Sequence, residues 1–166
     1  MIDLKEIKNK ILKKENFYLL IVIFIIFSLD RYTKIQIINH FNNETFYINN
    51  FVNLNLIWNT GIGFGFFRSN SAIIYNSITC VIAGVILFLV YLTIISKKFD
   101  KISFSIIIGG ALGNFYDRVI FNGVPDFIDL HFKNFHWFTF NLADVFITVG
   151  VILILIKGLF IKDVKF

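Results

Sequence analysis

GGALGNFYDR (residues 109–118), followed by VPDFID (124–129) and FNLAD (140–144), places several carboxylates between two strongly apolar segments. The whole chain is 57% hydrophobic, so we expect this stretch to lie at the edge of a membrane rather than on a solvated surface. Ionisable side chains are energetically costly in such a place, and this makes them functional candidates.

The composition is typical of a polytopic membrane protein. The chain has 166 residues, a mean hydropathy of +0.74, a single proline and 22 phenylalanines, which is too apolar for a soluble domain. We therefore expect one membrane domain covering residues 1–166. The net charge of +5 does not indicate nucleic acid, because the basic residues gather at the ends and in one short connection between apolar runs.

Hydropathy predicts an integral membrane all-α bundle of four transmembrane helices, at about residues 17–38, 71–95, 102–118 and 142–161. Two outward-facing loops, at about 39–70 and 119–141, separate them. The first 16 residues are basic and amphipathic, which suits an anionic cytoplasmic surface. The positive-inside rule places both chain ends and the lysine-rich connection at 97–101 in the cytoplasm. No small-residue cleavage site follows the first apolar run, so we expect an uncleaved helix.

The first outward loop contains a strand pattern. Val52, Leu54 and Leu56 alternate with asparagines, and this two-residue period predicts a half-buried strand and a small extracytoplasmic β-sheet. NTGIGFGFF (59–67) has three glycines among aromatic residues. It predicts a close-approach loop or a short interfacial helix rather than a regular strand.

Lysines near the inner ends of three predicted helices place three aspartates at a common depth. The pairs are Lys14 with Asp30, Lys101 with Asp117, and Lys157 with Asp144. On a helix, these spacings correspond to roughly 20 to 24 Å, against a hydrocarbon layer of about 30 Å. The loop after the third helix must return towards the fourth, so Asp126 can join the others. The sequence thus predicts several carboxylates converging in one outward-facing pocket.

Some of these acids have basic neighbours. Asp30 and Lys34 are four residues apart, so they share a helix face and can pair. The polar side chains of the third helix, Asn114, Asp117 and Arg118, also recur at helical spacing, and we expect Asp117 to pair with Arg118. Such pairs either hold helices together or support a site, and both interpretations stay open.

Asp126 and Asp144 have no basic residue within four positions, which favours a functional role. Two neighbouring acids that cannot both ionise share a proton, so one can accept a proton from water while the other donates to a carbonyl oxygen. This chemistry needs no cofactor. The sequence contains no HExxH and no GxSxG, and its histidines lie outside any metal-ligand spacing. We therefore expect neither a metal nor a cofactor.

Five ordered motifs resemble those of the lipoprotein signal peptidase family, the type II signal peptidases of bacteria. They are DRYTK (30–34), NTGIGF (59–64), GGALGNFYDR, VPDFID and FNLAD. The resemblance implies an aspartic endopeptidase of the bacterial cytoplasmic (inner) membrane, active on the extracytoplasmic side. Its substrates would be prolipoproteins whose cysteine carries diacylglycerol, cleaved before that cysteine. Partners would be these substrates and membrane lipids, and we expect a monomer.

The resemblance also implies roles for particular residues. It makes Asp126 and Asp144 the catalytic pair. Supporting or substrate-binding residues would be Asp30, Lys34, Asn59, Gly61, Asn114, Asp117, Arg118, Asn141 and Ala143. Two departures are mild: Pro125 directly precedes Asp126, and bulky Ile62 stands where the family often has a small residue.

Two other functions compete with a peptidase. A small transporter or proton channel also uses intramembrane acids, but it needs polar groups through the bilayer, and the inner halves of the predicted helices are nearly devoid of them. A non-catalytic scaffold would tolerate asparagine at position 126. The outer segments 46–67 and 132–138 could form a lid over the site, although an ordinary aromatic belt explains the second segment equally well.

Overall fold

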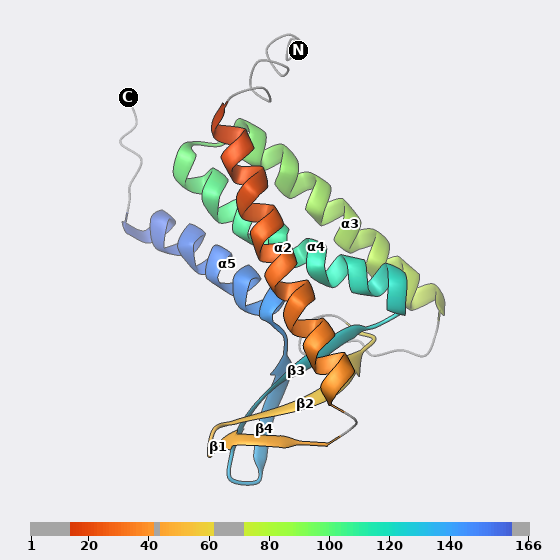
Figure 1. Cartoon of the computed structure of the whole chain (residues 1–166). Coiled ribbons are helices and arrows are strands. Elements are labelled where there is room, and N and C mark those ends of the chain that lie inside the picture. Colours follow the sequence, from red (N-terminus) through yellow and green to blue (C-terminus); the bar gives the residue numbers. More distant parts are fainter. Residues whose placement is uncertain (1–13, 42–43, 62–71, 161–166) are drawn as a thin grey trace.

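The computed structural model describes residues 14–41, 44–61 and 72–160, which form four helices and a four-stranded sheet (Figure 1). The elements in chain order are α2 (Lys14–His40), β1 (Phe46–Asn49), β2 (Val52–Asn59), α3 (Ala72–Ile95), α4 (Lys98–Phe121), β3 (Val124–Phe132), β4 (Phe135–Phe140) and α5 (Leu142–Phe160). The sheet lies at one end of the helices. Two of the helical segments, Ala72–Ile95 and Leu142–Leu159, are long and apolar enough to cross a membrane.

α4 lies at the centre of the helices, in contact with α2, α3 and α5 (Figure 1). Its glycines permit this close packing. A methyl group at Gly110 would lie 2.6 Å from the carbonyl oxygen of Ala143, and one at Gly109 would lie 2.8 Å from Cβ of Ile26. Because either contact would force the helices apart, the expected role of these glycines in close approach is confirmed.

The helix ends differ from the predicted spans. α4 begins at Lys98 rather than 102, so part of the expected lysine-rich connection belongs to its first turns, and it continues beyond 118 to Phe121. It ends where Asn122 adopts a left-handed conformation, with φ of 53°. Hydropathy marks only the apolar part of a helix, whereas backbone hydrogen bonding extends through charged ends. Most of the predicted amphipathic N-terminal segment and most of the glycine-rich segment 59–67 lie outside the described residues.

The sheet has the order β1-β2-β3-β4, with antiparallel neighbours throughout. The expected small sheet is therefore confirmed, but describing 119–141 as a loop was wrong, because most of it forms the β3–β4 hairpin. Pairing with β2 orders this segment. The predicted strand at β2 is also confirmed, with Val52, Leu54 and Leu56 half-buried, but burial does not alternate along it. Asn53 is buried instead and lies opposite Asp129 of β3.

Candidate active site

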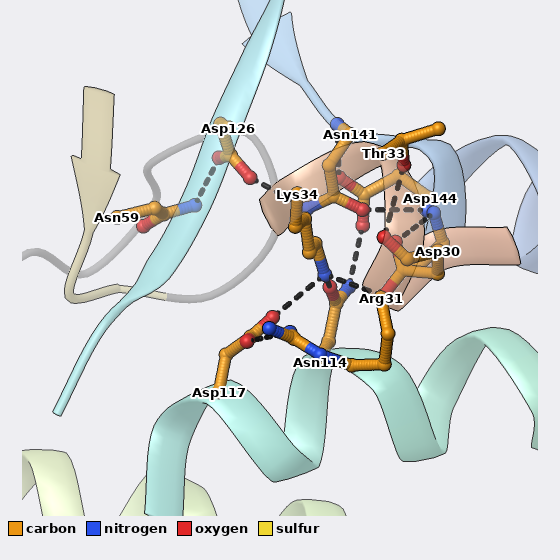
Figure 2. A network of polar contacts seen from close by, with 11 residues as sticks. Asp30, Arg31, Thr33, Lys34, Asn59, Asn114, Asp117, Asp126, Asn141 and Asp144 are labelled. Carbon is orange, nitrogen blue, oxygen red and sulfur yellow. Dashed lines mark hydrogen bonds and ion pairs between the residues drawn. The ribbon is translucent and has the colours of Figure 1, made fainter. Parts of the chain in front are cut away.

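Asp126 and Asp144 lie on either side of Asn141, where the sheet joins the helices (Figure 2). Asp126 lies on β3, and Asp144 lies in the first turn of α5. Both line one cavity of about 310 Å³, which we call the inner cavity. Its other lining residues are Asn59, Ile82, Val85, Ile86, Leu89, Ile107, Ala111, Asn114, Arg118, Val124, Asn141, Ile147 and Thr148. The predicted convergence of acids in one pocket is therefore confirmed for Asp126 and Asp144, whereas Asp30 and Asp117 do not line this cavity.

Two asparagine side chains hold the Asp126 carboxylate. Asn59 Nδ2 donates to its Oδ2 at 2.9 Å, and Asn141 Nδ2 donates to its Oδ1 at 2.6 Å. Asp126 is only 3% exposed. This burial, reinforced by the negative charge of Asp144, raises the pKa of Asp126 to about 7. The Asp126 carboxyl group therefore stays protonated at pH values well above those at which a carboxyl group usually ionises.

Pro125 precedes Asp126 within a strand, which is an unusual place for a residue that lacks an N–H group. At this position β3 pairs only with β2, where Pro125 lies opposite Trp58. β4 joins only from Ile128 onwards. Proline is tolerated where a strand is an edge, so the local topology accommodates it beside the site.

Asn141 connects the two aspartates. It precedes α5, and its backbone N–H donates to Oδ2 of Asp144 at 3.2 Å while the Asp144 N–H donates to Oδ1 of Asn141 at 3.2 Å. This reciprocal pair forms a capping box at the start of the helix. Because the Asn141 amide nitrogen also holds Asp126, one side chain positions both acids. The motif FNLAD therefore both caps the first turn of α5 and supplies two residues of the candidate site.

A second cluster of charges lies between α2 and α4 (Figure 2). Lys34 Nζ lies 2.8 Å from Asp30 Oδ2 and 2.7 Å from Asp117 Oδ2, and all three side chains are fully buried. Arg31 pairs with the other carboxylate oxygen of Asp117. The predicted pairing of Asp30 with Lys34 is confirmed. We call Asp30, Arg31, Lys34 and Asp117 the ion-pair cluster.

Asn114 and Ala143 link the ion-pair cluster to the two acids of the cavity. The Asn114 Oδ1 atom accepts from Lys34 Nζ at 2.8 Å, and its Nδ2 donates to Asp144 Oδ1 at 2.9 Å. The Ala143 N–H donates to Asp30 Oδ1 at 3.0 Å. Since Ala143 neighbours Asp144 in the chain, Asp30 helps to place the start of α5.

The predicted pairing of Asp117 with Arg118 was wrong. Adjacent residues on a helix do not face each other, and Asp117 instead turns towards the cations of α2. Arg118 donates to the carbonyl oxygen of Gly61, and its guanidinium carbon lies 5.7 Å from the centre of the Tyr75 ring. The Gly61 N–H donates to Asn59 Oδ1 at 2.9 Å. Arg118 thus fixes the turn that follows β2.

The sequence analysis did not identify two residues of this region. Arg31 follows Asp30 directly, and helical spacing gave no indication that it reaches Asp117 on another helix. The Tyr75 hydroxyl donates to the carbonyl oxygen of Arg118 at 2.9 Å, but Tyr75 lies in an apolar run with no local signal of this contact. Among the described residues, no group of three or more His, Cys, Asp or Glu side chains could hold a metal ion.

A family model described as signal peptidase (SPase) II matches residues 22–160. The chain belongs to the signal peptidase II family. A lipoprotein signal peptidase of Pelagibacter ubique is 47% identical over 161 residues, which cover 95% of this chain and 96% of the relative. One from Francisella tularensis subsp. mediasiatica is 37% identical over 150 residues, 87% of this chain and 92% of the relative.

A solved structure also resembles this member of the signal peptidase II family. It is a bacterial membrane enzyme determined by the in meso method at 2.3 Å resolution, with a TM-score of 0.75 and 28% sequence identity. The likeness covers 89% of this chain and 94% of that one. All five motifs quoted above fall within the residues matched by the family model.

Proposed function

We propose that this chain is an intramembrane aspartic endopeptidase that removes the signal peptide from diacylglyceryl-modified prolipoproteins, cleaving before the lipidated cysteine. Membership of the signal peptidase II family supports the activity and the substrate class. The observation that supports the mechanism is the placement of Asp126 and Asp144 in one cavity, hydrogen-bonded by asparagine amides and a backbone N–H.

In this mechanism, Asp126 and Asp144 share one proton. The ionised carboxylate takes a proton from water, whose oxygen bonds to the scissile carbonyl carbon, while the protonated acid gives its proton to the carbonyl oxygen. The product is a neutral gem-diol. On its collapse the C–N bond breaks, one aspartic acid protonates the leaving amine, and the other aspartate accepts a hydroxyl proton. The pair therefore regains its single proton, and the cycle needs no cofactor or metal.

The other residues of the site support this pair. Asn59 and Asn141 orient Asp126, and Asn114 orients Asp144. In the same proposal, the ion-pair cluster and Ala143 hold α2, α4 and α5 in register. Arg118 keeps Gly61 beside the cavity through its carbonyl oxygen.

We extend the proposal to the membrane arrangement. All four helices span the inner membrane as one domain and one monomer, with both chain ends in the cytoplasm and the site on the extracytoplasmic side. The sheet and the two acids lie together at one end of the helices, which supports a site at one membrane surface (Figure 1). At the other end, Lys157 pairs with Asp100 at 2.7 Å, so these two side chains neutralise each other.

Cleavage of a diacylglyceryl prolipoprotein by the purified full chain tests the function, with the unlipidated precursor run in parallel and the products identified by mass. We expect cleavage before the lipidated cysteine, no comparable cleavage of the unlipidated precursor, and no effect of a metal chelator. Equal cleavage of both precursors would refute the lipid requirement. Loss of activity on chelation, restored only by a divalent ion, would refute the aspartic mechanism.

A further inference from the structure

Asp144 lines a second cavity in addition to the inner cavity. This cavity has a volume of about 240 Å³, and its lining residues are Phe138, Phe140, Asp144, Val145, Thr148 and Val149. We call it the lateral cavity. Asp144 and Thr148, one helical turn apart on α5, line both cavities. The proposed catalytic carboxylate is therefore reached from two separate spaces.

The two cavities differ in their surroundings. The inner cavity extends between α3, α4 and α5 to side chains such as Ile86 and Ile107, which are 7% exposed. The lateral cavity lies between β4 and α5, and its wall includes Phe138 and Val149, which are 40% and 42% exposed. Apart from Asp144 and Thr148, its lining side chains are apolar. The lateral cavity is thus a shallow apolar space at the surface of the helices, next to the site.

We propose that the lateral cavity holds an acyl chain of the diacylglyceryl group on the substrate cysteine, and that the inner cavity takes the signal-peptide side of the scissile bond. This inference rests on the proposed function. Hydrolysis occurs at one carbonyl carbon, so the groups on both sides of the bond must lie beside the proposed catalytic acids. The inner cavity contains both acids, and the lateral cavity shares Asp144 with it.

The chemistry of the lipid decides which cavity holds which group. The glycerol is attached through the side chain of the residue directly after the scissile bond, so its acyl chains leave the site within a few bonds. They must then reach the hydrocarbon layer without crossing polar side chains. The lateral cavity offers an apolar surface that starts at Asp144 and continues along α5, through Val145 and Val149. The inner cavity has Asn59, Asn114 and Arg118 in its wall.

An acyl chain moves to this cavity from lipid rather than from water, so the transfer itself contributes little free energy. The lateral cavity therefore positions the lipidated cysteine rather than supplying strong affinity. Filling it should displace a long acyl chain and disturb the cysteine beside Asp144. A short chain that does not extend as far along α5 should be affected less. This dependence on chain length separates the proposal from a general loss of activity.

The test uses full-length protein in liposomes and two matched prolipoproteins, one with dipalmitoyl and one with dibutyryl glycerol on the cysteine. Val149→Trp fills the lateral cavity. We expect it to lower kcat/KM for the dipalmitoyl substrate roughly 10-fold or more, the scale expected when a bulky group enters an occupied space. The loss should be several times smaller for the dibutyryl substrate. Val151→Trp is the control, because Val151 is also exposed on α5 but lines neither cavity.

Two further variants keep the outcome decisive. Val149→Leu fills less of the cavity and should give an intermediate, chain-length-dependent loss, which replaces the tryptophan result if that variant unfolds. Val85→Trp fills the inner cavity and should lower cleavage of both substrates equally. Equal losses with Val149→Trp, or a chain-length-dependent loss with Val85→Trp, would overturn the proposal. If the wild-type protein cleaves neither lipidated substrate, the proposed function itself fails.

Discussion

Two groups of carboxylates lie side by side in this protein, and they differ in their partners (Figure 2). In the ion-pair cluster, Asp30 and Asp117 are fully buried and pair with Lys34, and Asp117 also pairs with Arg31. The hydrogen bonds to Asp126 and Asp144 come from asparagine side chains and a backbone N–H instead. All four residues are aspartates, so we infer that their hydrogen-bond and ion-pair partners determine whether they join helices or take part in the site.

Charge balance explains this difference. Acids with cationic partners can stay ionised in a buried position, and they then act as fixed charges that join helices. Acids held by neutral amides keep their orientation without a cation in direct contact, so a second negative charge in the pair is costly and the pair retains a proton. Asn114 contacts both groups, since it accepts from Lys34 and donates to Asp144. The ion-pair cluster therefore positions the proposed catalytic pair through Asn114 without forming an ion pair with it.

Replacing either proposed catalytic acid should have the largest effect. We expect Asp126→Asn and Asp144→Asn each to lower kcat by about 10³-fold or more, because asparagine can neither accept the proton of water nor return it. Cleavage of the lipidated precursor measures this, with unfolding temperature as a check on folding. Asp100→Asn is the matched control, because Asp100 pairs with Lys157 away from the site. Appreciable turnover by either variant would refute the assignment.

The ion-pair cluster should respond in stability instead. Lys34→Met leaves Asp30 and Asp117 buried without their shared cation, and we expect a loss of about 3–5 kcal/mol in the free energy of unfolding. The double variant Asp30→Asn, Lys34→Met removes both charges of one pair, leaves Asp117 paired with Arg31, and should recover part of that loss. Denaturant unfolding in detergent measures both. If Lys34→Met is as stable as the wild type, the cluster does not join α2 to α4.

The pH dependence of activity tests the shared proton. Because the pKa of Asp126 is raised to about 7, the pair should lose its proton as the pH rises through 7. Cleavage should then fall about tenfold per pH unit well above that value. Activity that stays constant from pH 7 to pH 9 would contradict a protonated acid in the mechanism.

Stability should follow the same titration. A raised folded-state pKa means that the folded protein binds more protons than the unfolded chain between pH 3.8 and about 7. The contribution of Asp126 to stability should therefore decline as the pH rises through this window. Asp126→Asn should show a flatter dependence of unfolding temperature on pH. Because the unfolding temperature depends only on proton binding here, the variant and the wild type can be compared without substrate.

Much of the site could be predicted because its determinants are local. Helical spacing paired Asp30 with Lys34, and the distances from the inner lysines brought Asp117 and Asp144 to one end of the helices. The absence of basic neighbours then distinguished Asp126 from the paired acids. Each of these inferences depends on residues within one segment, where a helix or strand period determines which side chains share a face.

The remaining features depend on contacts between distant segments. Residues 124–140, predicted as part of a loop, form the β3–β4 strand pair because β2 supplies hydrogen bonds to β3, and the local sequence does not reveal that partner. Arg31 on α2 pairs with Asp117 on α4, and Tyr75 on α3 donates to the carbonyl oxygen of Arg118. Spacing within one helix cannot indicate such pairs. The wrong pairing of Asp117 with Arg118 has the same cause: the sequence shows the adjacent basic residue, but not Arg31 and Lys34 on another helix.

The turn after β2 provides a smaller test of how the site is bounded. Gly61 is buried, and both its N–H and its carbonyl oxygen are engaged, by Asn59 and Arg118. We expect Gly61→Val to lower cleavage of lipidated substrate roughly 10-fold, because small displacements near reacting groups are costly. The protein should stay folded. Gly84→Val is the control, since among the described residues no atom beyond the adjacent residues and the backbone of its own helix lies within 4 Å of a methyl group built there. Wild-type cleavage by Gly61→Val would mean that this turn does not approach the substrate.

The smallest effect is expected at the β3–β4 hairpin, where an aromatic belt and a lid predict different results. Trp137 is 61% exposed and meets the Phe135 ring edge-to-face at 6.0 Å. In a lid it would contact the substrate, so Trp137→Ala should raise KM about 2- to 3-fold with little change in kcat, the loss of one exposed aromatic contact. Phe46 on β1 is 60% exposed and provides the comparison. A belt anchors the sheet in the interface through all of its rings, so Phe46→Ala and Trp137→Ala would then have equal effects. A larger effect on KM at Trp137 alone would support the lid, because only a residue that faces the substrate changes KM without changing how the sheet is anchored.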